Sequence, residues 1–96
     1  VNSFSKALFE AVITNKNDID KTIEAVSNKW KVSRFSTVTR AIVRLAVGEI
    51  MYTDVPAKVA INEAVEISKI YDDDKATSFI NGVLNSIARN LGKIEG

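Results

Sequence analysis

The feature that most constrains this chain is one continuous stretch, residues 55–89, which carries two apolar helical patterns in succession. Apolar residues that recur every three or four positions lie on one side of an α-helix. The first pattern consists of Val59, Ala60, Ala64, Ile67 and Tyr71. The second consists of Ala76, Phe79, Ile80, Val83, Leu84, Ile87, Ala88 and Leu91, and stops at Gly92. The stretch therefore predicts two consecutive helices, the first opened by Pro56 at its first helical position.

Three earlier segments show the same periodicity, and each predicts a further helix. The first holds Phe4, Leu8, Ala11 and Val12; the second holds Ile19, Ile23, Val26 and Trp30; the third, from Thr37 to about Met51, holds Val38, Ile42, Leu45 and Ala46. Residues 42–47 are apolar nearly all round apart from Arg44, so the third helix is predicted to be the most buried. Five helices with short connectors and no alternating strand pattern predict an all-α, compact helical bundle. Residues 1–96 are expected to form a single domain.

Several residues predict where these helices begin, end and approach one another. Asn17 and Ser36 are expected to cap the second and third helices, because Asn and Ser side chains accept hydrogen bonds from free backbone N–H groups. One aspartate of the acidic corner at residues 72–74 is expected to cap the last helix. Gly82 lies inside that helix at a cost of about 1 kcal/mol relative to alanine, which predicts a close approach by a neighbouring helix.

Composition excludes several classes of function. The chain has no cysteine, which rules out a disulfide scaffold and thiolate chemistry. It also has no histidine, the residue most used in general acid–base catalysis, so an enzyme is the least expected class and no cofactor is implied. No apolar run approaches the roughly 20 residues that cross a bilayer, and no leader precedes the first helix. A soluble, cytoplasmic protein without a membrane partner is the expectation.

Charged and aromatic residues leave two interpretations open. Five basic residues and no acidic one lie between positions 29 and 44, which indicates either a solvated face or a patch facing phosphates. The three adjacent aspartates point in different directions and are followed by no glycine, so capping is favoured over a metal site. Helical spacing places Trp30 in the core. Tyr71 and Phe79 flank the corner, where either packing or stacking on nucleic-acid bases is open to them.

Three blocks of this sequence resemble a known family. VPAKVAINEAVEISKIY (residues 55–71) followed by SFINGVLNSIAR (78–89) is similar to the C-terminal signature of NusB transcription antitermination factors. RAIVRLAVGEIMY (40–52) resembles the helix before it in that family. The resemblance implies an all-helical fold of two small bundles and no catalysis. It also implies binding of boxA RNA together with the ribosomal protein NusE, in a complex that lets RNA polymerase read through terminators.

The resemblance also implies site residues, matched position by position. The RNA-facing candidates are Lys58, Tyr71, Lys75 and Phe79. The candidates for contact with the protein partner are Arg34, Thr37 and Arg40. The corner reads YDDDKATSF, and its acidic run departs from the family's usual pattern, in which a glycine often follows the aromatic residue.

A second departure lies at the N-terminus. Members of the family begin with an arginine-rich segment that contacts RNA, whereas this chain begins at Val1 without an arginine cluster. We expect the family's N-terminal helices to be missing and RNA affinity to be weaker than the family's norm. Their absence is expected to leave an apolar face uncovered on the first or second helix, so that the chain self-associates or exchanges helices.

The sequence leaves two alternatives to an antitermination factor open. One is the related RNA-binding domain that some ribosomal RNA cytosine methyltransferases carry at their N-terminus. The end of the chain after the last helix speaks against that alternative. The other is a helical protein-protein interaction domain with no RNA role, which the near-neutral net charge of +1 and the acidic corner favour.

Overall fold

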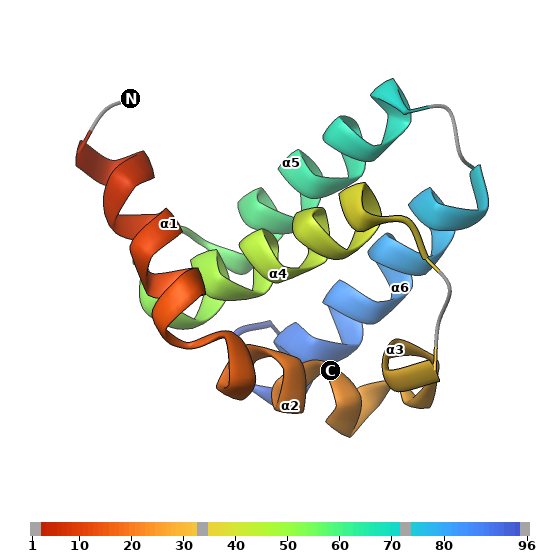
Figure 1. The fold of residues 1–96 in the computed structure, drawn as a ribbon, viewed down its shortest axis with the longest axis horizontal. Helices are drawn as coiled ribbons and strands as arrows, with labels where there is room; N and C mark the ends of the chain where they lie inside the picture. Colours follow the sequence, from red (N-terminus) through yellow and green to blue (C-terminus); the bar gives the residue numbers. More distant parts are fainter. Residues whose placement is uncertain (1–2, 33–34, 72–73, 95–96) are drawn as a thin grey trace.

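Six α-helices form the part of the chain that this computed structural model describes, residues 3–32, 35–71 and 74–94 (Figure 1). They are α1 (Ser3–Thr14), α2 (Lys16–Val26), α3 (Asn28–Val32), α4 (Thr37–Tyr52), α5 (Ala57–Ile70) and α6 (Asp74–Asn90). The described residues contain no β-strand, which confirms the predicted all-α class. No helix among them is long and apolar enough to span a membrane.

Helix α4 is the centre of the fold. It packs against α1, α2, α5 and α6, and Figure 1 shows it running through the middle of the molecule. Eight of its residues are buried, more than in any other helix, as the apolar run at 42–47 predicts. Helices α5 and α6 follow it as an antiparallel hairpin, and their buried side chains complete the core against α4. The central helix therefore fixes the relative positions of its four neighbours.

One predicted helix is divided in two. The periodic run from Ile19 to Trp30 breaks at Ser27, whose backbone is extended at φ −148° and ψ 107°. The N–H of Ser27 still donates to the Ile23 carbonyl, and the short helix α3 follows at once. Serine and asparagine compete with helical hydrogen bonding through their own side chains, which accounts for a break at Ser27-Asn28. Trp30 remains buried, at 2% exposure, as its spacing predicts.

Capping predictions have mixed outcomes. Ser36 caps α4, because its hydroxyl accepts a hydrogen bond from the Thr39 N–H at 3.1 Å. The prediction for Asn17 is wrong: α2 begins at Lys16, and the residue before it, Asn15, turns its side-chain amide back to the Ala11 carbonyl. Pro56 lies one position before α5 and not within it. Of the three aspartates, Asp72 and Asp73 lie outside the described residues, and Asp74 opens α6.

The end of α6 is a Schellman motif. Gly92 has φ +71°, a left-handed conformation that glycine adopts without a Cβ penalty. The Gly92 N–H donates to the Arg89 carbonyl, and the Lys93 N–H donates to the Ala88 carbonyl at 2.8 Å. These are the two hydrogen bonds that satisfy the last free carbonyls of a helix in this motif. The predicted stop at Gly92 is confirmed.

Two glycines inside helices differ in what surrounds them. A Cβ on Gly82 would meet nothing within 4 Å, so the predicted close approach of another helix at this position is wrong. A Cβ on Gly48 would lie 2.5 Å from Cγ2 of Val12. The close approach is therefore between α1 and α4, at Gly48.

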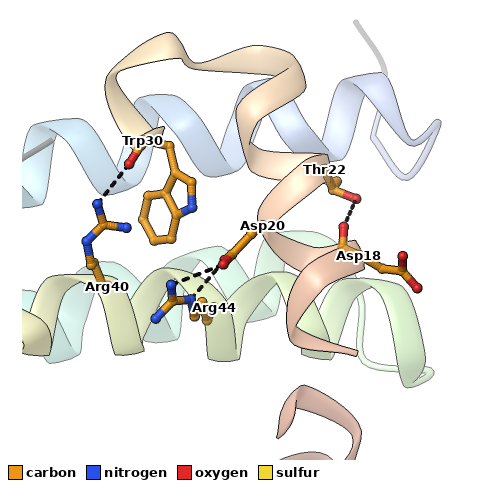
Figure 2. Close-up of polar contacts among 6 residues, drawn as sticks. All are labelled: Asp18, Asp20, Thr22, Trp30, Arg40 and Arg44. Carbon is orange, nitrogen blue, oxygen red and sulfur yellow. Dashed lines mark hydrogen bonds and ion pairs between the residues drawn. The ribbon is translucent and has the colours of Figure 1, made fainter. Parts of the chain in front are cut away.

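A cluster of polar and aromatic side chains ties α2 and α3 to α4 (Figure 2). Arg44 donates two hydrogen bonds to the Asp20 carboxylate, from Nε to Oδ1 at 2.9 Å and from Nη2 to Oδ2 at 3.1 Å. The Arg40 Nη2 donates to the Trp30 carbonyl at 2.8 Å. The guanidinium carbons of Arg40 and Arg44 also lie 4.6 and 5.4 Å from the centre of the Trp30 ring. Two-point contacts between arginine and carboxylate fix geometry as well as adding energy, so this cluster sets how α2 and α3 sit on α4.

The apolar stripe predicted for residues 59–71 does not face the core as a whole. Ala60 and Ala64 are buried, but Val59, Ile67 and Tyr71 are 44%, 44% and 58% exposed. The core-facing set of α5 is instead Ala57, Ala60, Ile61, Ala64 and Ser68. Apolar residues lie on more than one side of α5, so their spacing alone does not fix the rotation of the helix about its own axis.

The two glycines predict opposite effects of alanine. Gly82→Ala should raise the free energy of unfolding by about 1 kcal/mol, since it adds helix propensity without a steric conflict. Gly48→Ala should lower it by about 1 kcal/mol net, because overpacking of roughly 1–3 kcal/mol against the stiff Val12 outweighs the same gain. Urea unfolding measures both variants, and adding Val12→Ala to Gly48→Ala should restore stability. Stabilisation by Gly48→Ala alone would contradict this packing of α1 on α4.

The Arg44–Asp20 ion pair predicts a second difference. Asp20→Asn should lower the free energy of unfolding by about 1–3 kcal/mol, because a hydrogen bond to a charged group is lost and Arg44 stays partly enclosed. The matched control is Glu66→Gln in the Glu66–Lys69 pair, where both side chains are more than half exposed. Exposed pairs contribute about 0–1 kcal/mol, so this variant should be close to neutral. Equal effects of the two variants in urea unfolding would argue against an anchoring role for Arg44.

Candidate nucleic-acid and partner interface

Three of the four RNA-facing candidates gather at the corner between α5 and α6. Tyr71 directly follows the last residue of α5 and is 58% exposed. Lys75 is exposed in the first turn of α6, and Phe79 lies four residues later on the same side of that helix. The corner therefore combines one free aromatic ring, one cation and one half-buried aromatic ring.

Phe79 has an aromatic partner. Its ring stacks on Phe35, with the ring centres 4.2 Å apart and the planes inclined by 29°. Phe35 lies just before α4, so the pair joins the segment before α4 to α6. One face of Phe79 is thus used inside the protein, and Tyr71 is the more accessible surface for a stacked base.

A groove of about 240 Å³ lies beside Tyr71. It is lined by Ser36, Val38, Thr39 and Ile42 from the start of α4, by Ser68 and Tyr71 from α5, and by Ala76 from α6. The Ser68 and Thr77 hydroxyls share a hydrogen bond of 2.8 Å that ties α5 to α6 beneath it. The groove joins apolar surface to hydroxyl groups and has no charged side chain in its lining. That character suits a protein side chain better than a phosphate.

A wider groove of about 480 Å³ has Phe79 in its lining. The α2–α3 junction contributes Val26, Ser27, Asn28 and Lys29 to its lining, and α6 contributes Ser78, Phe79, Gly82, Val83 and Ser86. Lys29 is exposed there, so a cation, hydroxyls and an aromatic ring share one open surface. Gly82 lines this groove, and a Cβ on it would meet nothing within 4 Å.

Lys58 is not brought to this corner. It is exposed in the first turn of α5, and Tyr71 follows the opposite end of the same helix. Thirteen helical positions correspond to about 20 Å along the axis. A single RNA strand would have to follow α5 to touch both residues.

The three candidates for contact with a protein partner have different surroundings. Thr37 is exposed at the first position of α4, close to the groove beside Tyr71. Arg40 is partly buried and binds the backbone and ring of Trp30 (Figure 2), so it already has a structural role. Arg34 lies outside the described residues.

Among the residues that the structure describes, two ionisable groups have shifted pKa values, and both lie away from the corner. Burial raises the pKa of the Glu49 carboxyl above its usual 4.5, and the nearby negative charge of Glu63 raises it further. Burial, with a smaller contribution from Asp18, raises the pKa of the Tyr52 hydroxyl above 10. Within the described ranges no group of three His, Cys, Asp or Glu side chains could hold a metal ion.

Sequence reasoning missed the groove residues that stand beside Tyr71. Ser36 was visible only as a helix cap, and Thr39 and Ser68 only as polar residues within helical patterns. Thr39 and Ser68 are buried, and burial cannot be predicted from the sequence for a polar residue within a helix. Their common surface arises because α4 and α5 pack antiparallel, which brings the start of one beside the end of the other.

Comparison with known proteins places the chain in a family. The model of the NusB family matches residues 1–89. The chain is 42% identical over 91 residues to the transcription antitermination protein NusB of Anaeromyxobacter dehalogenans, covering 95% of this chain and 64% of that protein. It is 46% identical over 88 residues to the protein of the same name from Listeria monocytogenes serotype 4a, covering 91% and 69%. No solved structure gives a significant match.

The chain thus spans about 64% of the length of the relatives from Anaeromyxobacter dehalogenans. The match covers α1 to α5 and nearly all of α6, including the corner and the central helix. A family model that matches nine-tenths of the chain, together with relatives above 40% identity, establishes the relationship. The chain belongs to the NusB family.

Proposed function

We propose that this chain is the RNA- and protein-binding part of a transcription antitermination factor. It binds a boxA-type single-stranded RNA together with the ribosomal protein NusE, within the antitermination complex of RNA polymerase, and it catalyses no reaction. Family membership carries this proposal, because the relatives are named as transcription antitermination proteins. The arrangement of the corner between α5 and α6 supports it.

RNA contact is assigned to Tyr71, Lys75 and Phe79 at the corner, with Lys58 as a separate contact along α5. Single-stranded RNA is held by cations that meet its phosphates and by aromatic rings that stack on its bases. The exposed ring of Tyr71 and the exposed ammonium of Lys75 offer both kinds of group at one end of the molecule. Lys29, which shares the open groove with Phe79, is a further cation on the same side of α6.

Partner contact is assigned to the start of α4, at Thr37 and Arg40, together with Arg34. The uncharged groove beside Tyr71 supports a protein ligand at this place. Tyr71 lines that groove and also stands at the RNA-facing corner. RNA and protein would therefore meet at adjoining surfaces, which favours joint binding over two independent sites.

Salt dependence tests the RNA assignment. Binding of a fluorescent boxA-type RNA, with NusE present, should weaken steeply as salt rises, because phosphate contacts release counterions. Lys75→Ala and Lys58→Ala should each lower affinity and reduce the slope of log K against log salt by about 0.7. Lys16→Ala is the matched control, since Lys16 is equally exposed but lies on α2.

Tyr71 tests the stacking contact. Tyr71→Ala should weaken RNA binding by about 1–3 kcal/mol if the ring carries a base, whereas Tyr71→Phe should keep most of the affinity. Because Tyr71 is 58% exposed, neither variant should disturb folding, and circular dichroism checks this. Absence of RNA binding at low salt, with NusE still bound, would favour a helical protein-binding domain without an RNA role.

A further inference from the structure

The open groove between the α2–α3 junction and α6 has the charge that an anionic ligand needs. Its volume of about 480 Å³ lies within the roughly 300–1,000 Å³ of sites that bind small ligands. Its lining contains one cation, Lys29, and no carboxylate. An apolar groove between α4 and α5, by contrast, is bordered by Glu49 and Glu63. The sign of the charge therefore favours a phosphate in the first groove and disfavours one in the second.

The polar side chains of this groove are not used inside the protein. Lys29 is exposed on α3, and no carboxylate among the described residues pairs with it. Within residues 3–32, 35–71 and 74–94, the side chains of Asn28, Ser78 and Ser86 form no hydrogen bond with another residue. An amide, two hydroxyls and an ammonium group thus face one open space with their hydrogen-bonding capacity intact.

Gly82 is a second, independent sign of a ligand in this groove. Glycine inside a helix destabilises it relative to alanine. At Gly48 the close approach of α1 accounts for a glycine, but a Cβ on Gly82 would meet no protein atom within 4 Å. Glycine also allows a ligand to lie close to the backbone. Gly82 therefore keeps open a space that no part of the described chain fills.

The groove continues the corner between α5 and α6 along one side of α6. Lys75, Phe79, Gly82 and Ser86 follow the spacing i, i+4, i+7, i+11, so they share that side of the helix. Eleven positions correspond to about 16 Å along the axis. Figure 1 shows α6 running from the corner to α2, against which it packs. Phe79 belongs to both places, because its ring stacks on Phe35 and also lines the groove, which Phe35 does not.

We propose that this groove is a subsite for one nucleotide of a single-stranded RNA whose neighbouring nucleotides bind at the corner; the inference rests on the proposed function. The base lies over Gly82 and packs against the part of the Phe79 ring that Phe35 leaves uncovered. Lys29 pairs with a phosphate of the strand. The hydroxyls at positions 78 and 86 and the amide at position 28 bond to the ribose 2′-OH and the base edge, the groups by which proteins recognise single-stranded RNA.

Filling the groove tests the place of the base. Gly82→Leu should weaken binding of a fluorescent boxA-type RNA, with NusE present, about fivefold or more, which corresponds to the loss of one stacked base. Gly82→Ala should weaken binding less but in the same direction, although alanine favours the helix. The matched control is Asn81→Leu, because Asn81 is equally exposed on α6 but does not line the groove. Circular dichroism should show unchanged helix content in all three variants.

A pair of lysines on α3 tests the phosphate contact. Lys29→Ala should lower RNA affinity and reduce the slope of log K against log salt by about 0.7, the value for one phosphate contact to a single strand. Lys31→Ala removes the same charge from the same short helix, where Lys31 is exposed but does not line the groove. The control variant should leave the slope close to that of the wild type.

Removing bases from the RNA identifies the nucleotide itself. RNAs that lack one base each, at successive positions, are titrated against the wild type and against Gly82→Leu. At one position the missing base should weaken binding by the wild type about fivefold or more, yet weaken binding by Gly82→Leu much less, because both changes remove the same contact. Additive effects at every position would reject a base in the groove.

Three other outcomes would overturn the proposal, and they separate it from the proposed function. If Lys75→Ala weakens RNA binding but the groove variants match their controls, the subsite is rejected and the proposed function stands. If the wild type binds no RNA at low salt while NusE still binds, both are rejected. If Gly82→Leu weakens binding of NusE in the absence of RNA, a protein segment and not a nucleotide occupies the groove.

Discussion

Burial of the central helix α4 is the constraint on which the rest of this structure depends. Val43, Val47 and Ile50 are almost fully enclosed, and their neighbours on the helix contact four other helices. A helix that is apolar nearly all round can be stable in water only when other helices cover it on several sides. The hairpin of α5 and α6, the anchoring of α2 and the crossing of α1 at Gly48 all satisfy this requirement.

Polar contacts set the details of that arrangement. Arg44 projects from the buried helix α4, and its charge would by itself oppose burial. Its ion pair with Asp20 offsets that cost and joins α4 to α2. Arg40 is held by Trp30 in the same cluster. Two of the five basic residues between positions 29 and 44 are thus used inside the protein. The basic stretch is therefore less of a phosphate-facing patch than its composition implies.

Apolar side chains remain exposed on α1, α4 and α5. Helices α4 and α5 cover one another by small residues such as Ala60 and Ala64, which leaves the larger Leu45 and Ile67 at the rim of a groove. On α1 the larger residues Phe9 and Ile13 point outward. An apolar face exposed on the first or second helix was expected, and Phe9 and Ile13 lie on the first; the apolar groove between α4 and α5 was not expected.

The sequence by itself determined the helical class, the ends of α4 and α6 and the membership of a family. These depend on local signals: periodic apolar residues, a serine cap, a glycine stop and contiguous motifs. Only the tertiary structure decided that Gly48 rather than Gly82 meets a neighbouring helix. It also decided which side of α5 is buried. Each of these depends on where separate helices meet. A periodic pattern gives the spacing of apolar residues along a helix, but the rotation of that helix about its axis is set by how it packs against its neighbours.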